Sequence, residues 1–184
     1  MDPLSTSVLI DAPRDRVFEY LADIANHPEF TDHFLVDWRL TRELSIGRGA
    51  GARFRVKAPA NRFAWGDVSF SEVLAPRRIV EVGRQGKGNR IRTLGVWELR
   101  EASSGTTRVT FTYQSESATP WDRMSEALGG RLWLARQQRR AMRRLRRRLE
   151  SERSERPAGA RGSALPPGGS PSGGPAGRIT VAGG

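Results

Sequence analysis

The side chains in this sequence that could carry acid–base chemistry are few and scattered. General acid–base catalysis needs a titratable group near the substrate with a pKa close to neutrality. We single out Asp67, because period-two spacing puts it on the same face as Phe63 and Trp65, and Tyr113, whose hydroxyl could orient a ligand. A plain surface position is the competing interpretation of Asp67. The full set of candidates is Asp23, His27, His33, Asp67, Glu72 and Tyr113.

Metal and cofactor chemistry has little support in the composition. The chain has two histidines and no cysteine, so a disulfide framework and a thiolate metal site are excluded and a histidine-based metal centre is not expected. His27 and His33 lie where a helical region meets a strand, a place where a histidine more often caps a helix or lies on the surface. The run Gly47–Gly51 lacks G-x-G-x-x-G spacing and precedes a strand, so we interpret it as a turn. We expect no metal and no cofactor.

Apolar residues at alternating positions form a more consistent candidate site. If the apolar face of each strand looks inward, large aromatic side chains would face a long apolar helix and could pack against a planar ligand. The same side chains would also fill a core with no room for a ligand, so both interpretations stay open. The predicted ligand-binding residues are Trp38, Phe54, Val56, Trp65, Trp97, Leu99, Phe111, Tyr113, Met124, Leu128 and Leu132.

The elements that would position these residues begin with a strand over 7–10. Asp11 could cap the helix that follows, and Pro13 suits its first turn. Val17 and Leu21 repeat at helical spacing, and a broken second helix follows at 26–30.

Period-two alternation then predicts a series of strands. Short connections between consecutive strands favour an antiparallel meander. In 63–73 apolar residues fall on both faces, which predicts a bulge or a two-sided strand. The predicted strands are 36–40, 54–56, 63–73, 79–83, 91–100 and 108–115.

A long helix is predicted from Pro120 to Leu149. Its apolar residues recur at intervals of three, four and seven, so one face must be buried, and the concave side of the sheet is the large surface available. Gly129 and Gly130 interrupt this pattern and predict a kink or a close approach to a strand or ligand.

Positive charge is concentrated at the C-terminal end of the chain. The formal net charge is +11, of which residues 1–130 contribute +1 and residues 131–184 contribute +10. A solvated helix extension, an anionic lipid surface and nucleic acid all compete as interpretations; nucleic acid ranks last, because no aromatic residues interleave for base stacking. The candidate anion-binding residues are Arg136, Arg139, Arg140, Arg143, Arg144 and Arg147.

The 184 residues suggest one domain over 1–153, with an arginine-rich helix end over 136–153. Residues 154–184 are rich in Pro, Gly and Ser and poor in apolar side chains, so we expect them to be disordered. The chain has neither a signal-peptide pattern nor a run of about 18 apolar residues, and we therefore expect a soluble, cytoplasmic protein.

The order of short motifs resembles a known superfamily. The motifs are Ile10-Asp-Ala-Pro13, His27-Pro28-Glu29-Phe30, the turn from Gly49 to Phe54, the segment from Glu72 to Ile79, Gly95-Val-Trp-Glu-Leu99, Gly105-Thr-Thr-Arg-Val109 and the final helix. Together, over 8–149, they resemble the START-like (SRPBCC) helix-grip superfamily, in particular its bacterial polyketide cyclase/dehydrase branch. The resemblance implies an α+β fold in which a seven-stranded antiparallel sheet wraps a long C-terminal helix, with two short helices after the first strand.

The resemblance also implies a cavity for a hydrophobic ligand between sheet and helix, but no transferable catalytic motif. Three functions stay open. The first is a carrier or sensor of a lipid or polyketide-like ligand, and the second is an enzyme that cyclises or dehydrates such a ligand. The third is an interaction protein whose arginine-rich helix binds an acidic partner, an anionic membrane or nucleic acid.

Overall fold

The computed structural model describes residues 2–57, 65–116 and 130–155. The predicted lining residues Met124 and Leu128, and the tail beyond 155, lie outside the described residues. In chain order the elements are β1 (Leu4–Ile10), α1 (Arg14–Ala22), η1 (Ile24–Asn26), α2 (Pro28–Thr31), β2 (Leu35–Leu40), β3 (Gly51–Val56), β4 (Trp65–Leu74), β5 (Arg78–Gln85), η2 (Lys87–Asn89), β6 (Ile91–Ser103), β7 (Thr106–Glu116) and α4 (Arg131–Glu155).

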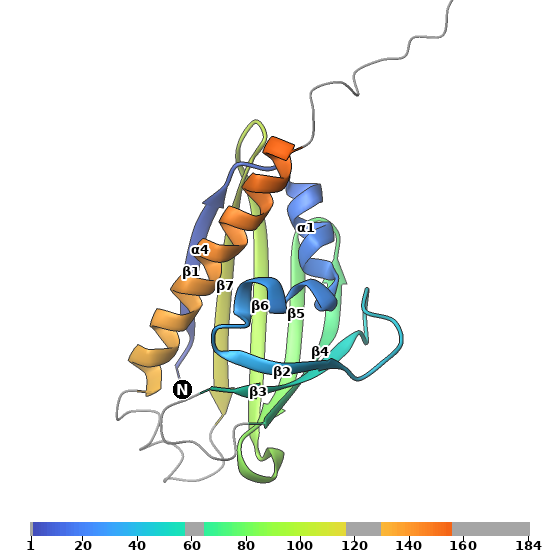
Figure 1. The fold of residues 1–184 in the computed structure, drawn as a ribbon, viewed down its shortest axis with the longest axis vertical. Helices are drawn as coiled ribbons and strands as arrows, with labels where there is room; N and C mark the ends of the chain where they lie inside the picture. The colour runs from blue at the N-terminus through green and yellow to red at the C-terminus, as the bar shows by residue number, and fades with distance from the viewer. Residues whose placement is uncertain (1, 58–64, 117–129, 156–184) are drawn as a thin grey trace, which may run out of the picture.

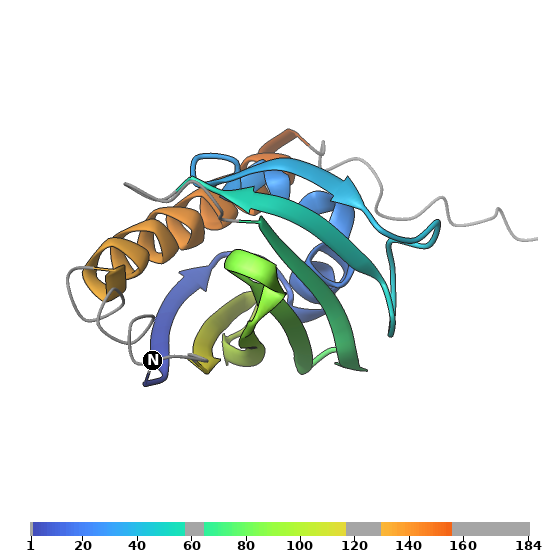
Figure 2. The same cartoon turned by 90° about the horizontal axis from the view of Figure 1, so that it is seen from below.

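The seven strands form one antiparallel sheet in the order β1-β7-β6-β5-β4-β3-β2. The first strand therefore pairs with the last, and every other pairing joins consecutive strands. Figure 2 shows the sheet curling into a half-barrel whose open side, between β1 and β2, is spanned by α4. The short helices that connect β1 to β2 lie over the concave face (Figure 1). This is the predicted α+β helix-grip arrangement.

Local irregularities help the sheet to curl. The register shifts between Val36 and Arg39 in β2, and between Phe70 and Glu72 in β4. Such bulges bend the strand and increase its twist. Between Trp65 and Phe70 the register is regular, so the two-sided apolar pattern predicted for 63–73 is that of a two-sided strand there, with Trp65 and Val68 on opposite faces. The bulge comes after this stretch and reverses which residues face inward on either side of Ser71.

The start of α1 differs from the prediction. Asp11 does not cap the helix: Pro13 occupies the N-cap position and no side-chain hydrogen bond caps it. Instead the backbone N–H of Asp11 donates to Glu150 of α4 at 3.1 Å. Asp23 is the residue that caps, accepting from the backbone N–H of Ala25 at the start of η1.

The packed core lies between α1, the sheet and the C-terminal half of α4. From α4 it receives Met142, Leu145 and Leu149, which are almost completely buried. Leu132 faces solvent instead and is 69% exposed. A step of three residues falls about 60° short of a helical turn, so going back from the buried Ala135 rotates position 132 off the buried face. Within the described ranges, no helix combines the length and apolar character needed to cross a membrane.

Candidate functional site

Most of the predicted lining shares the concave face of the sheet. Residues paired directly across neighbouring strands point to the same side, and Ile79, Trp97 and Phe111 form one such row. The predicted lining residues on this face are Trp38, Phe54, Val56, Trp97, Leu99, Phe111 and Tyr113.

A carboxylate lies among these rings. Glu81, in the middle of β5, occupies the row next to Trp97 and is paired with Gly95. Its Oε1 accepts a 2.6 Å hydrogen bond from the indole Nε1–H of Trp97. The Nδ1 of His27 lies 3.8 Å from the same oxygen, and the two side chains are only 5% and 12% exposed. The concave face therefore holds an acid, an imidazole and an indole N–H together.

The protonation of His27 follows from its second partner. Its Nε2 lies 2.9 Å from the backbone carbonyl oxygen of Leu21. A carbonyl oxygen only accepts, so Nε2 carries a hydrogen, and Nδ1 is the nitrogen that faces Glu81. The ring is also held by aromatic neighbours, with centroids 5.3 to 6.1 Å away in Phe30, Trp38, Phe70 and Trp97.

The environment of Glu81 favours its neutral form. Burial raises the pKa of the Glu81 carboxyl, while His27 and the Trp97 indole oppose that rise. A neutral carboxyl offers an O–H donor as well as an acceptor, whereas a carboxylate only accepts. Glu81 is thus a group that can donate a hydrogen bond or a proton inside an apolar surface.

Gly95 makes room for this carboxyl. A Cβ at position 95 would lie 3.0 Å from Oε2 of Glu81 and 3.0 Å from the ring of Phe111. Both contacts are closer than an ordinary van der Waals separation. Gly95 therefore lets the acid and the aromatic ring lie side by side over β6.

A second hydrogen-bond donor on this face is free. The indole Nε1 of Trp38 is buried and has no hydrogen-bond partner. Trp38 stacks on Phe54 with centroids 5.1 Å apart and an interplanar angle of 10°. A buried donor without an acceptor is costly, which a ligand acceptor would relieve.

The end of the concave face at the C-terminus of β5 is more polar and less buried. There Gln85 donates from Nε2 to the hydroxyl of Tyr113 at 2.8 Å. Both residues, like Phe111, are half-buried, in contrast to the packed core beneath α1. The interior thus passes from a closed apolar core, through the Glu81 cluster, to a polar and partly open end.

Two of the predicted residues lie on the opposite face. Trp65 and Asp67 point to the convex side, where Trp65 is 41% exposed. Asp67 pairs with Arg53 at 2.8 Å and accepts from Asn89 at 2.7 Å. The prediction that Asp67 and Trp65 share a face is correct, but that face is the convex one. Neither residue therefore lines the concave face of the sheet.

The remaining acid–base candidates have local roles. His33 accepts from Arg144 and contacts the carbonyl oxygen of Gln137 at 3.2 Å, which links the turn after α2 to α4. Glu72 forms an ion pair with Arg78 on the convex face. None of these groups approaches Glu81.

Glu81 itself was not among the predicted site residues. It lies in the sequence Ile79-Val80-Glu81-Val82-Gly83, in which both faces of the strand carry apolar residues. An acid in the centre of an otherwise apolar strand was the available signal. Among the described residues, no group of three or more potential ligands could hold a metal ion.

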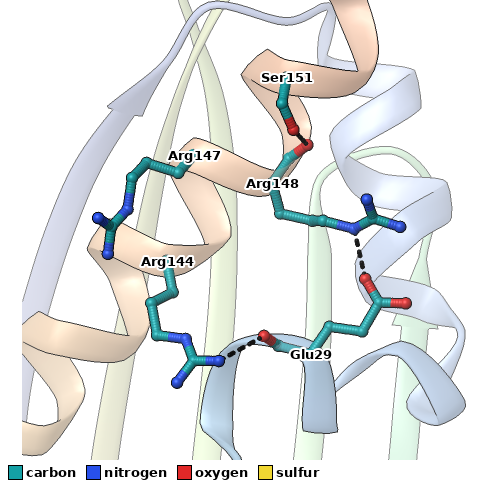
Figure 3. Close-up of a pocket in the computed structure, with 5 residues that line it drawn as sticks. All are labelled: Glu29, Arg144, Arg147, Arg148 and Ser151. Atoms are coloured by element: carbon teal, nitrogen blue, oxygen red, sulfur yellow. Dashed lines mark hydrogen bonds and ion pairs between the residues drawn. The ribbon is translucent and has the colours of Figure 1, made fainter. Parts of the chain in front are cut away.

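A shallow surface pocket of about 380 Å³ lies elsewhere, between α2 and α4. Figure 3 shows Arg148 and Arg144 directed toward Glu29, while Arg147 extends away from it. The Nε of Arg148 lies 2.6 Å from Oε2 of Glu29, and Nη2 of Arg144 donates to the Glu29 carbonyl at 3.2 Å. Arg144, predicted to bind anions, is thus already engaged within the fold.

Comparison with known proteins places this geometry in context. A family model described as polyketide cyclase / dehydrase and lipid transport matches residues 1–150. No curated protein matches the sequence. Among solved structures, the KanY protein is similar, with a TM-score of 0.61 and 18% identity, covering 80% of this chain and 97% of that one.

Two further solved structures share the fold. One, from Deinococcus radiodurans, has a TM-score of 0.56 and 18% identity, covering 83% of this chain and 99% of that chain. The other, from Thermus thermophilus, has a TM-score of 0.59 and 16% identity, with coverages of 82% and 98%. At these identities the likeness shows the fold alone.

Proposed function

Because the chain belongs to the polyketide cyclase/dehydrase and lipid transport family, we propose that it binds a small hydrophobic or aromatic ligand on the concave face of its sheet, as a carrier or sensor. The observation that carries this proposal is the Glu81 carboxyl, held between His27 and Trp97 in a wall of aromatic rings. Packing alone does not explain an acid in that position, because a buried carboxyl destabilises a core relative to an apolar side chain.

The side chains specify the chemistry of the ligand. Aromatic rings favour a planar, apolar body, which gains about 25 cal/mol for each Å² removed from water. Burial raises the pKa of Glu81 and so favours the protonated carboxyl, which, like the unpaired Trp38 indole, can donate a hydrogen bond beside His27. The preferred ligand is therefore planar and apolar, with a carbonyl or phenolic oxygen that accepts from them.

A matched pair of probes tests this proposal. We expect the wild-type protein to bind 2-acetylnaphthalene more tightly than 2-isopropenylnaphthalene, which has the same shape but lacks the oxygen. Glu81→Leu should weaken the ketone by about tenfold, as for a lost buried hydrogen bond, and leave the hydrocarbon nearly unchanged. Phe111→Ala should weaken both, measured by tryptophan fluorescence titration.

The control for this experiment is Asp67→Asn, on the convex face. It removes an acid of the same sheet without touching the concave side, and both probes should bind it as they bind the wild type. Wild-type protein that binds neither probe, or a Phe111→Ala variant that binds both unchanged, would exclude the concave face as the binding site.

A second candidate function is catalysis on the bound ligand, and the pairing of Glu81 with His27 favours it. Acids and bases with displaced pKa values concentrate at active sites. In a cyclisation, neutral Glu81 would protonate the carbonyl oxygen under attack, and the resulting carboxylate would accept the proton released from carbon. Mass spectrometry of ligand extracted from the wild type and from Glu81→Gln tests this role. A converted compound in the wild type only would support catalysis, and identical compounds would favour a carrier or sensor.

A further inference from the structure

Helix α4 carries an unbalanced set of charges. Between 131 and 149 it has nine arginines and no acidic residue. Four of the nine form ion pairs: Arg131 with Asp2, Arg144 with Asp32, Arg146 with Glu150 and Arg148 with Glu29. The other five form no ion pair or hydrogen bond with side chains in the part of the chain that the structure describes.

The five unpaired arginines share one face of the helix. We call them the arginine row. Spacings of three, four and seven residues keep their side chains on one stripe, which spans about 16 Å along the axis. All five are exposed, and the stripe lies opposite the buried Ala135, Met142, Leu145 and Leu149. The arginine row consists of Arg136, Arg139, Arg140, Arg143 and Arg147.

The paired arginines lie beside this row and hold the helix in place. Arg144 and Arg148 reach down to α2, as Figure 3 shows, while Arg147 points the other way. Arg146 is held on the opposite flank by Glu150. The ion pairs of Arg131, Arg144 and Arg148 therefore join α4 to the rest of the domain, whereas the Arg146–Glu150 pair lies within the helix. The arginine row is left as a cationic face.

Such a row is unfavourable in isolation. Like charges three and four residues apart destabilise a helix by a few tenths of a kcal/mol for each pair. An opposing layer of negative charge would remove that repulsion. The row is also straight and has an exposed apolar side chain, Leu132, at its N-terminal end.

We propose that the arginine row docks α4 onto an anionic phospholipid membrane. Each basic side chain near such a surface adds to the attraction, and a single exposed leucine can enter the apolar boundary of the headgroup layer. The row contains no aromatic side chain that could stack on nucleic-acid bases. This proposal does not depend on the ligand proposed for the concave face.

Vesicle co-sedimentation of the full chain tests the proposal. The vesicles are phosphatidylcholine alone, or phosphatidylcholine with about one third phosphatidylglycerol. We expect binding only to the anionic vesicles, and a decline as salt is raised, because added ions screen exposed charges. The variant R136Q/R140Q/R143Q/R147Q should lower the partition constant by about six-hundredfold, given a contribution of about fivefold for each of the four arginines.

A second quadruple variant separates position from total charge. R84Q/R92Q/R100Q/R108Q removes the same charge from exposed arginines of the convex face of the sheet. It should bind anionic vesicles within a few fold of the wild type. Circular dichroism should show both variants folded.

Three results would overturn the proposal. The first is a wild-type protein that ignores anionic vesicles at low salt, and the second is an equal loss of binding in the two quadruple variants. The third is tighter binding to a duplex DNA than to anionic vesicles at the same salt, lost only in the arginine-row variant, which would assign the row to nucleic acid.

Discussion

Trp97 donates the hydrogen of its indole Nε1 to Oε1 of Glu81 at 2.6 Å, which joins the acid of β5 to the aromatic wall of β6. The oxygen accepts this bond whether the carboxyl is neutral or ionised. Because the bond is present in both states, the NMR resonance of this indole N–H reports on the protonation of Glu81 without a chemical label attached to the protein.

Glu81→Gln should make stability less dependent on pH. Burial raises the pKa of Glu81 above its usual value of 4.5. The folded state thus holds this proton more tightly than the unfolded chain. The contribution of Glu81 to the free energy of unfolding is therefore fully present below pH 4.5 and is lost as pH rises through the raised pKa. Glutamine keeps the shape and the acceptor oxygen. Thermal melts across pH should show the variant gaining on the wild type toward neutral pH, and a constant difference would contradict the raised pKa.

His33 should produce the opposite trend at mildly acidic pH. Burial lowers the pKa of His33 below its usual 6.5, and the guanidinium groups of Arg140 and Arg144 lower it further, against the opposing effects of the Gln137 carbonyl and Asp32. The unfolded chain then binds the proton more tightly, so stability is complete above pH 6.5 and is lost as pH falls through the lowered pKa.

The variant His33→Gln provides the comparison, because glutamine can still bond to the same neighbours without titrating. As pH falls from about 7 to about 5, the melting temperature of the wild type should drop relative to that of the variant. Repeat scans at a higher protein concentration should give about the same shift. A difference that stays level through that range would show that His33 does not titrate in this environment.

Gly95→Ala should disturb the Glu81 cluster. The added Cβ would lie 3.0 Å from both Oε2 of Glu81 and the Phe111 ring, so the neighbours must move by a few tenths of an ångström. We expect a destabilisation of about 1–3 kcal/mol, typical of overpacking. The indole N–H resonance of Trp97 in a nitrogen–proton NMR spectrum should also shift. Gly105→Ala, at a turn with open space but with φ at +78°, should also destabilise the protein through backbone strain, yet it should leave this resonance in place, so the resonance is what separates the two variants.

Arg144 and Arg147 should respond differently to truncation. Arg144 bonds to Asp32 at 2.6 Å and to the Glu29 carbonyl, whereas Arg147 belongs to the unpaired arginine row. Arg144→Ala should lower the free energy of unfolding by about 1 kcal/mol, the upper end for a partly exposed pair with added hydrogen bonds. Arg147→Ala should change it by less than about 0.5 kcal/mol. Urea unfolding measures both, and equal losses would contradict the division into paired and unpaired arginines.

The sequence predicted the elements better than it predicted the site. Period-two and helical spacing act locally, so strands, turns and the α4 amphipathic face could be identified from a few neighbouring residues. The family resemblance supplied the seven-stranded sheet wrapped around the C-terminal helix, but not the pairing of the first strand with the last. The outward orientation of Trp65 and Asp67 depended on which of two apolar faces of β4 is buried, and nothing within that strand decides it.

The Glu81 cluster was harder to predict for a different reason. His27 and Glu81 come from separate elements, and they meet only because the sheet curls back under the short helices. Burial then changes the chemistry of the acid, a property of the surroundings and not of the residue type. Contacts of this kind depend on tertiary packing, so local spacing does not show them.

The pairing of β1 with β7 has a consequence for how the chain is made. Ser7 and Thr110, hydrogen-bonded through their side chains at 2.8 Å, are 103 positions apart in the sequence. During synthesis β1 therefore emerges long before its partner strand exists. Until then the backbone N–H and C=O groups along both of its edges have no strand to pair with. A ribosome stalled before β7 would hold a sheet with an unsatisfied end strand, the kind of edge that recruits other chains. Completion of the fold is thus deferred to the last strand and the helix after it, and partial products of this gene should depend on chaperones to stay dispersed.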